Sequence, residues 1–393
     1  MSNALINRSN DLKKLRDAGY EIEVRGAFLL VQGVPYVNRL REVGLGILVS
    51  ELTLAGDVTT NPTTHVIHFV GGQPCDITGT EISSIRHSEG DQHLVEGVVV
   101  NRSFSNKPDG GFRDYYEKVT NYVDIISAPA EILDPTLSAR SYKIIESEEG
   151  ESVFRYLDTN SSRAEIDLIA DKLKPEKIGI VGLGGTGSYV LDMVAKSSVA
   201  EIHLFDRDDF LQHNAFRAPG AASIEDLHRK HKKVDYFHEI YSKMRSGIFA
   251  HPLFLDSRSV PLLDGLTFIF ICMDRGTAKA EIIEYLEKHQ IAFVDVGMGV
   301  EQIDDRLSAS LRVTTSTPKK RDHIRANRLI SFSDAAEDDY DRNIQVTELN
   351  ALNAALAVVK WKKLSGYYID LANEYDTTYS LDDNALINED HEA

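Results

Sequence analysis

The chain has 393 residues and a formal net charge of −18, with 42% hydrophobic and 26% charged residues. This composition excludes a fibrous or disordered chain, and the length suits roughly two or three domains. The acidity argues against sequence-independent binding to nucleic acid, which needs a basic surface.

Short apolar runs and a polar beginning of the chain predict neither a membrane-spanning helix nor a signal peptide. The only cysteines are Cys75 and Cys272, and no Cys-x-x-Cys pair occurs. We therefore expect a cytoplasmic protein that binds no zinc and has no membrane or nucleic-acid partner.

Residues 1–145 contain short alternating apolar stretches separated by Gly, Pro and Asn. This pattern predicts a smaller β-rich α+β domain, an accessory region and a candidate for binding a partner. One helix is expected over 112–126, with one apolar face. Its members are Tyr115, Val119, Tyr122 and Ile126.

Residues 150–375 alternate between strand and helix patterns, which predicts a Rossmann-like, doubly wound parallel α/β sheet. Strands are expected at 177–181, 202–205, 266–273 and 291–297. Helices are expected at 162–173, 185–196, 223–245, 277–289 and 347–368, the last with an apolar stripe of Leu349, Leu352, Leu356 and Val359. Residues 376–393 are predicted to be a frayed acidic tail.

The stretch "IGIVGLGGTG" at 178–187 is typical of a phosphate-binding turn between a strand and a helix. Gly182 permits the tight reversal, Gly184 and Gly185 let the backbone approach phosphate oxygens, and Gly187 completes the pattern. Asp206 follows 24 residues after Gly182, where a carboxylate can accept ribose hydroxyls. The glycines alone fit a dinucleotide or ATP.

The residues after Asp206 favour a triphosphate. Asp208, Asn214, Arg217 and Lys233 follow it in the sequence, and Asp274 ends the next buried strand. Amide, guanidinium and ammonium groups suit phosphates, and the two carboxylates suit Mg²⁺. No positioned His or Lys for hydride transfer is evident.

Together these motifs resemble the ThiF-type, ubiquitin-activating family of adenylyltransferases, over about residues 150–368. The resemblance rests on Gly-x-Gly-Gly-x-Gly at 182–187, Asp206-x-Asp208, Asn214-x-x-Arg217, Lys233 and Asp274. It implies ATP- and Mg²⁺-dependent adenylation of the C-terminal carboxylate of a ubiquitin-like or sulfur-carrier protein, with release of pyrophosphate. The expected setting is a bacterial conjugation or sulfur-transfer pathway.

The resemblance also implies the role of each residue. Asp206 would bind ribose, while Asn214, Arg217 and Lys233 would hold the phosphates. Asp274 would hold Mg²⁺, with Asp208 near it. A homodimer is implied, in which Arg163 or Arg155 completes the partner's site. Arg217, Lys233, Asp274 and Arg163 are the expected catalytic set.

The chain departs from the family at three points. Asp274 is followed by Arg275, and Lys279 stands where many members have arginine. No cysteine follows Asp295, where activating enzymes often place a thioester cysteine, and zinc-binding pairs are absent. We therefore expect an acyl-adenylate and no thioester from this domain alone.

Cys75 has two readings. Its spacing from His65 and Gly72 resembles the active-site segment of ubiquitin-conjugating enzymes, which would make it a thioester cysteine. The asparagine expected two residues after that histidine is Ile67, so a half-buried packing role is the simpler interpretation. A separate conjugating enzyme is a further candidate partner.

Two other functions stay open at this point. One is an NAD-dependent Rossmann oxidoreductase, which would bind nicotinamide and show no pyrophosphate exchange. The other is a nucleotide-binding pseudoenzyme that acts as a scaffold, against which the complete set of acidic and basic residues argues.

Overall fold

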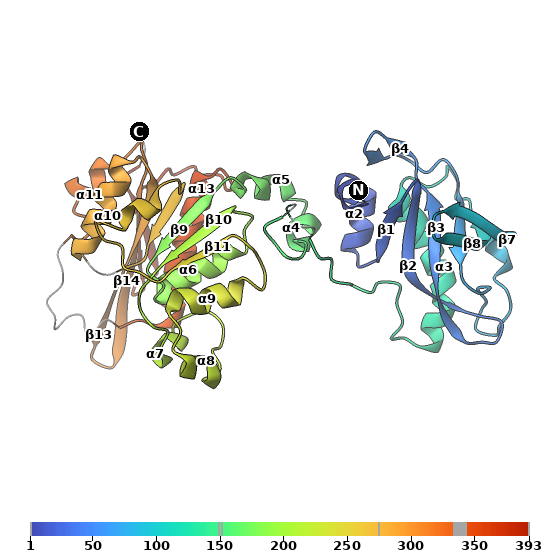
Figure 1. Ribbon diagram of the computed structural model, residues 1–393, viewed down its shortest axis with the longest axis horizontal. Coiled ribbons are helices and arrows are strands. Elements are labelled where there is room, and N and C mark those ends of the chain that lie inside the picture. The colour runs from blue at the N-terminus through green and yellow to red at the C-terminus, as the bar shows by residue number, and fades with distance from the viewer. Residues whose placement is uncertain (1, 148–149, 151, 274–275, 333–343, 392–393) are drawn as a thin grey trace. The chain divides into compact units, whose positions relative to one another are not determined.

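The computed structural model describes residues 2–147, 150, 152–273, 276–332 and 344–391. Their contacts divide the chain into two units (Figure 1). The N-terminal unit contains residues 1–145 and 158–165, and the C-terminal unit contains residues 146–157 and 166–393. Among the described residues, every helix is too short or too polar to span a bilayer.

The N-terminal unit is built on a six-stranded antiparallel sheet, in the order β1-β2-β3-β6-β8-β7. Its strands are β1 (Ile22–Arg25), β2 (Phe28–Val37), β3 (Val43–Glu51), β6 (Val66–Val70), β7 (Arg86–Val95) and β8 (Val98–Ser105), beside a small hairpin of β4 (Leu54–Ala55) and β5 (Val58–Thr59). The helices are α1 (Ser2–Arg8), α2 (Asn10–Asp17), α3 (Tyr115–Leu133) and α4 (Thr159–Arg163), with a short 3-10 turn η1 (Ser83–Ile85).

The predicted helix of this unit is confirmed, although it ends at Leu133, about two turns further than expected. Asp114 caps α3 by accepting a hydrogen bond from the backbone N–H of Glu117 at 2.8 Å. The predicted face, Tyr115, Val119, Tyr122 and Ile126, is fully buried against the sheet.

The C-terminal unit contains an eight-stranded mixed sheet, in the order β11-β10-β9-β12-β13-β14-β15-β16. The strands from β11 to β13 are parallel, and those from β13 to β16 are antiparallel. They are β9 (Lys177–Val181), β10 (Glu201–Phe205), β11 (Ile248–His251), β12 (Phe268–Ile271), β13 (Ala292–Ile303), β14 (Arg306–Ser316), β15 (Asp376–Ser380) and β16 (Ala385–Glu389).

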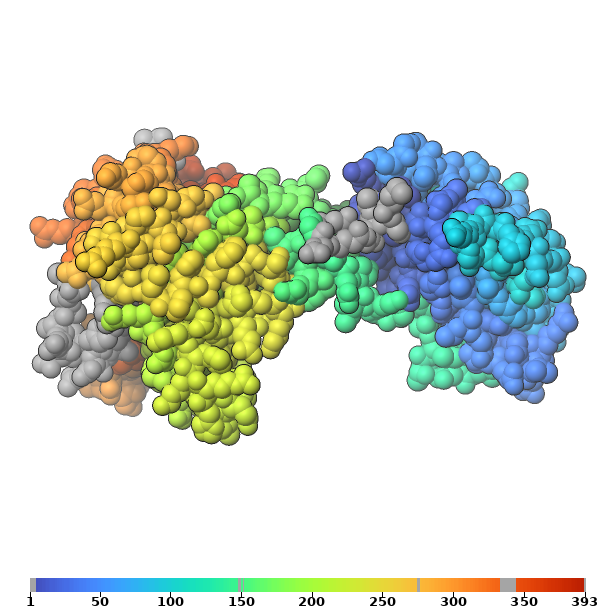
Figure 2. Space-filling model, in the orientation of Figure 1, coloured from blue at the N-terminus to red at the C-terminus, as the bar shows by residue number. Residues whose placement is uncertain are grey.

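Helices cover both faces of the parallel part of this sheet. One face carries α6 (Gly185–Ala195), α9 (Lys233–Tyr241) and α13 (Thr347–Leu364), and the other carries α10 (Gly276–Lys288) and α11 (Asp322–Ala326). The shorter helices are α5 (Asp167–Ala170), η2 (Asp171–Leu173), α7 (Gln212–Ala215), α8 (Ile224–Arg229) and η3 (Val260–Leu263). In the space-filling view, the segment from α8 to α10 forms much of the unit's visible face (Figure 2).

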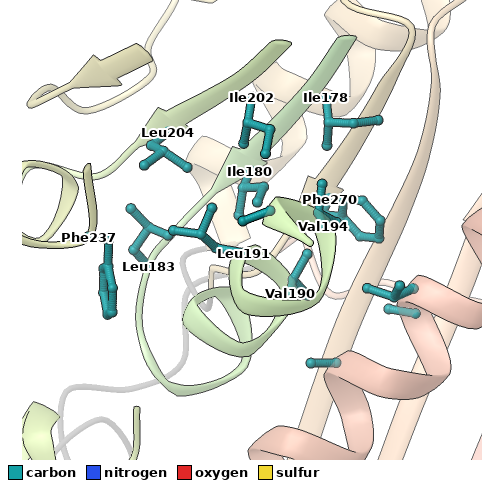
Figure 3. Close-up of a cluster of buried hydrophobic side chains, with 14 of the residues drawn as sticks. Ile178, Ile180, Leu183, Val190, Leu191, Val194, Ile202, Leu204, Phe237 and Phe270 are labelled. Carbon is teal, nitrogen blue, oxygen red and sulfur yellow. The ribbon is translucent and has the colours of Figure 1, made fainter. Parts of the chain in front are cut away.

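Alternation along the strands explains this arrangement. Ile178 and Ile180 of β9 point toward α6, whereas Val181 joins the core on the opposite face (Figure 3). Leu191 and Val194 of α6 close over the isoleucines. Because both faces of a parallel sheet are covered, its strands are apolar at nearly every position.

The predicted fold class is confirmed, and the structure corrects three details. The sheet is parallel only from β11 to β13, since β14, β15 and β16 extend it with antiparallel pairs. Residues 162–173 form the separate turns α4, α5 and η2 instead of one helix. The tail is not frayed over 376–389, because β15 and β16 pair there.

In the turn from β9 into α6, backbone atoms leave no room for a side chain at Gly182 or Gly187. Gly182 has a φ of +89°, and a Cβ there would lie 2.5 Å from the Cys272 carbonyl oxygen. A Cβ on Gly187 would lie 1.9 Å from the carbonyl oxygen of Gly182. Gly184 is different, because a Cβ at this position would meet nothing within 4 Å.

These contacts predict a large loss of stability for one substitution and a small change for a matched one. Gly187→Ala should lower the free energy of unfolding of the C-terminal unit by about 3 kcal/mol or more, since backbone cannot yield as a side chain does. Gly184→Ala should change it by less than about 1 kcal/mol. Urea unfolding followed by fluorescence of Trp361, the chain's only tryptophan and fully buried, measures both. Equal losses would contradict the steric argument.

Candidate functional site

A cavity of about 180 Å³ lies where the parallel strands of the C-terminal unit end. The strand order reverses at β9, because β10 lies on one side of it and β12 on the other. Open α/β sheets bind ligands in the crevice at such a point. The polar and glycine residues that line the cavity are Gly182, Gly184, Gly185, Thr186, Asp206, Arg207, Asp208, Arg217, Lys233, Gly297, Gln345 and Asn353.

Asp206 stands at the end of β10 and organises the backbone around the cavity. One oxygen of its carboxylate accepts the backbone N–H of Leu183, in the glycine turn, at 2.7 Å. The other accepts the backbone N–H of Asp208 at 2.8 Å. A carboxylate has about four acceptor positions, so Asp206 can hold both backbone segments and still accept hydroxyl groups of a ligand.

Lys233 begins α9 and brings a buried positive charge to the cavity. Its side chain is 8% exposed, and its Nζ lies 3.0 Å from Asp208 Oδ2 and 3.7 Å from Asp206 Oδ2. The side chain of Asp208 is 60% exposed. The Lys233 ammonium group is paired with a carboxylate, but the residue also lines the cavity. An anion that enters the cavity can therefore reach it.

Arg217 adds a second cation on the same side, from the segment just after α7. Its backbone N–H donates to the carbonyl of Asn214 at 3.1 Å, so the two residues share one turn. The charges on Arg217 and Lys233 extend to His213, whose pKa is lowered first by partial burial and then by these two cations. Two cations therefore lie at this side of the cavity, although the chain is acidic overall.

Asn214 supplies a buried amide next to these cations. Its side chain is 3% exposed, and its Oδ1 accepts the backbone N–H of Leu211 at 2.9 Å, which fixes the first turn of α7. Its Nδ2 has no hydrogen-bond partner among the described residues. Such a donor costs roughly 1–3 kcal/mol when it stays unsatisfied, which suits a ligand that brings an acceptor.

Most of the predicted site residues come together. Seven of them line the cavity: Gly182, Gly184, Gly185, Asp206, Asp208, Arg217 and Lys233. Gly187 lies behind the turn, where its role is steric, and Asn214 stands beside the cavity. Gly185 also has a steric role, because a Cβ there would lie 2.2 Å from the side-chain nitrogen of Asn350. Asp274 lies outside the described residues.

Two predicted residues belong to the other unit. Arg163 ends α4 and is exposed. Cys75 is fully buried, and burial raises the pKa of its thiol. Its Sγ lies 3.4 Å from the carbonyl oxygen of Gln73. A buried thiol with little thiolate suits packing and not thioester chemistry, so the simpler of the two readings is favoured.

A metal ion would need carboxylates at the mouth of the cavity. Among the described residues, no group of three or more His, Cys, Asp or Glu side chains could hold one. Mg²⁺ usually takes only one or two carboxylates and completes its shell with phosphates and water. Asp208, with its exposed side chain, fits that pattern.

The sequence did not reveal the contribution of α13 and the residues before it. Gln345 and Asn353 line the cavity, and Asn350 packs against the glycine turn. The expected apolar stripe on this helix was wrong in part, since Leu352 and Val359 are 36% and 42% exposed. Two asparagines three residues apart in the apolar central stretch of this helix were the available signal.

Comparisons with known proteins also divide the chain into an N-terminal and a C-terminal part. Residues 161–347 match the model of the ThiF family, and residues 10–159 match a domain of unknown function (DUF6791). A tRNA threonylcarbamoyladenosine dehydratase from Haemophilus influenzae is 24% identical over 134 residues, which is 34% of this chain. The chain spans about half the length, 51%, of this curated relative.

Solved structures of the Escherichia coli enzyme MccB are also similar. The complex with ATP is 18% identical, with a TM-score of 0.45, over 59% of this chain and 69% of that one. The microcin C7 biosynthetic enzyme MccB with N-formylated MccA is 16% identical, with a TM-score of 0.46, over 73% and 80% of the two chains.

The family model covers the glycine turn, Asp206, Asp208, Asn214, Arg217 and Lys233. Residues 161–347 of this chain are therefore a ThiF family domain, which follows a separate N-terminal domain over residues 10–159.

Proposed function

We propose that the protein is an ATP- and Mg²⁺-dependent adenylyltransferase that activates the C-terminal carboxylate of a ubiquitin-like or sulfur-carrier protein. The observation that carries this proposal is the cavity itself. Gly184, Asp206, Arg217 and Lys233 line it together, and a Cβ on Gly184 would meet nothing within 4 Å. The unsatisfied amide donor of Asn214 lies in the same turn as Arg217. A ThiF family domain supports ATP as the nucleotide.

In the proposed mechanism, Asp206 accepts the ribose hydroxyls while it holds the glycine turn. Lys233, Arg217 and Asn214 hold the phosphates and stabilise the charge that develops on them. An oxygen of the substrate carboxylate attacks the α-phosphorus, and the bond from that phosphorus to the bridging oxygen breaks. An acyl-adenylate forms and pyrophosphate leaves. No protein nucleophile is required, since the chain's residues act by position and charge.

Asp208 and Asp274 are the proposed Mg²⁺ ligands. Bound Mg²⁺ would neutralise phosphate charge and orient the leaving group. The exposed carboxylate of Asp208, which pairs with Lys233, can turn toward a cation without loss of buried packing.

We further propose a homodimer in which Arg163 of one subunit acts on the nucleotide of the other. This follows the family resemblance and the exposure of Arg163 on α4. The N-terminal domain, residues 1–145, would be an accessory region that binds the protein substrate or a conjugating enzyme.

ATP affinity should depend on Lys233 and not on its neighbour. Lys233→Met should weaken ATP binding roughly 10- to 100-fold, because a charge-assisted hydrogen bond to phosphate is worth about 1.5–3 kcal/mol. Lys232→Met is the matched control, since this lysine is 42% exposed and pairs with Asp209 at 2.7 Å. Isothermal titration with a non-hydrolysable ATP analogue measures both. Equal affinities for the two variants would remove Lys233 from the site.

ATP–pyrophosphate exchange tests the reaction. Proteins with a C-terminal Gly-Gly should stimulate Mg²⁺-dependent exchange, and Asp274→Ala should reduce it by at least about a hundredfold, a loss of about 2.7 kcal/mol of transition-state stabilisation. Asp209→Ala, at an exposed carboxylate paired with Lys232, should leave exchange intact. Full exchange by Asp274→Ala would overturn the metal assignment.

The same assay distinguishes other substrates. The curated relative is named for a modified tRNA nucleoside, so tRNA is added in a separate arm. Exchange with tRNA and not with proteins would overturn the proposed substrate class. Bound nicotinamide without any exchange would indicate an oxidoreductase.

The dimer is tested by mixing two inactive variants. Arg163→Ala keeps an intact nucleotide cavity, and Lys233→Met keeps an intact arginine. If Arg163 acts in the partner's site, mixed dimers contain one complete site and regain exchange activity. Mixtures that stay inactive, while each variant remains a dimer by size-exclusion chromatography, would contradict action in trans.

A further inference from the structure

Two buried oxygen atoms at the cavity lack a hydrogen-bond donor among the described residues. They are Oδ1 of Asn353, on α13, and Oε1 of Gln345, just before that helix. Both residues line the cavity, and Asn353 is fully buried. A buried carbonyl oxygen without a donor costs roughly 1–3 kcal/mol, so these atoms suit a ligand that donates.

The amide of Asn353 has a fixed orientation. Its Nδ2 donates to the carbonyl oxygen of Gly297, on β13, at 3.0 Å. The amide cannot be flipped, because its oxygen would then face the carbonyl oxygen of Gly297, and neither atom can donate a hydrogen bond. The amide oxygen is therefore the atom left without a partner.

Asn350 holds the start of α13 in place. Its Oδ1 accepts from the Thr186 hydroxyl at 2.9 Å, and its Nδ2 donates to the Val346 carbonyl at 3.0 Å. Because Gly185 has no Cβ, the helix packs directly on the glycine turn. Asn353, one turn further along, is thus set on a rigid support.

The strand order separates Asp206 from the strand to which Asn353 bonds. Asp206 follows β10 and Phe254 follows β11, both on one side of β9. Gly297 and Met298 belong to β13, on the other side of β9, and Asn353 bonds to that strand. If ribose binds to Asp206, the α-phosphorus would lie over the glycine turn, and the carboxylate would approach it from the β13 side.

The chemistry of the two atoms restricts what they bind. Carbonyl oxygens repel a carboxylate, so they cannot hold the attacking group itself. They can accept an N–H donor next to it. In a polypeptide, the nearest such donor is the backbone N–H of the C-terminal residue, and the next is the N–H of the residue before it.

We propose that Asn353, assisted by Gln345, accepts the backbone N–H groups of the last residues of the acyl substrate. This inference rests on the proposed adenylation. It makes Asn353 a positioning residue that selects peptide C-termini over simple carboxylic acids. A site built to bond an N–H rejects an analogue that lacks one, because the buried acceptor then stays unpaired.

Stable mimics of the acyl-adenylate test this inference without knowledge of the natural substrate. Three probes are compared on the full chain: sulfamoyl adenosine, glycylglycyl-sulfamoyl adenosine, and the glycylglycolyl analogue in which an ester oxygen replaces the last amide N–H. Isothermal titration should show the ester binding roughly 10- to 100-fold more weakly than the amide. Equal affinity of the two would overturn the inference.

The variant Asn353→Leu, combined with the amide and ester probes, completes a double-mutant cycle. Leucine has a similar volume to asparagine but no hydrogen-bond acceptor. In this variant, amide and ester should bind within about twofold of each other, since the acceptor that distinguishes them is gone. Leu352→Ala, at a partly exposed position on the same helix, is the control and should keep the wild-type ratio. A ratio that survives Asn353→Leu would assign selectivity to another group.

Failure of the inference and failure of the proposed function differ in outcome. Sulfamoyl adenosine has no acyl group, so its binding reports the nucleotide site alone. If it does not bind to the wild-type chain, the adenylation proposal fails. If it binds and the amide and ester do not differ, only the role of Asn353 fails. The wild-type comparison stands even if Asn353→Leu does not fold.

Discussion

The site depends on one steric constraint, the close approach of backbone to backbone where β9 turns into α6. Gly187 lies against the carbonyl of Gly182, and Gly182 lies against the carbonyl of Cys272. This contact ties the first strand of the parallel sheet to its first helix and to β12. The N–H groups at the start of α6 consequently face the cavity at the point where the strand order reverses. Unpaired donors and the helix dipole there favour an anion.

The charges around the turn are arranged for exchange of partners. In the structure, Lys233 is paired with Asp208, whose side chain is largely exposed, while the same lysine lies near buried Asp206. A phosphate that reaches Lys233 would compete with this exposed carboxylate for the ammonium group. Asp206 differs, because its two backbone hydrogen bonds hold it in place. The buried acid is therefore fixed, and the exposed acid is the adaptable one.

Sequence patterns predicted well where one physical signal dominates. The apolar run in "KIGIV" located β9 at 177–181, and the steric need for glycine located the turn. Asp206 was found because parallel strands end at one edge of the sheet. Arg217 and Lys233 were found because their cationic groups suit phosphates and because their spacing resembles the family motif. The spacing of Tyr115, Val119, Tyr122 and Ile126 likewise predicted the buried face of α3.

Prediction failed where the partner of a segment is distant in sequence. β13 and β14 continue past the core, and β15 pairs with β14 across about sixty residues. The polar composition of 376–389 hid that pairing, because edge strands facing solvent do not need an apolar pattern. The predicted apolar stripe on α13 was wrong in part for a related reason. Small residues, Ala354 and Ala357, face the core there, so larger Leu352 stays outside.

The two asparagines of α13 show why such failures are informative. Both interrupt the apolar central stretch of the helix, and both are fully buried. Asn350 has partners for its oxygen and its nitrogen, so packing and hydrogen bonding explain it. Asn353 has a partner only for its nitrogen among the described residues. An apolar residue would fill the same space but could not accept a hydrogen bond. Asn353 thus keeps a hydrogen-bond acceptor at the cavity, and a ligand with an N–H donor beside the attacking carboxylate would pair with it.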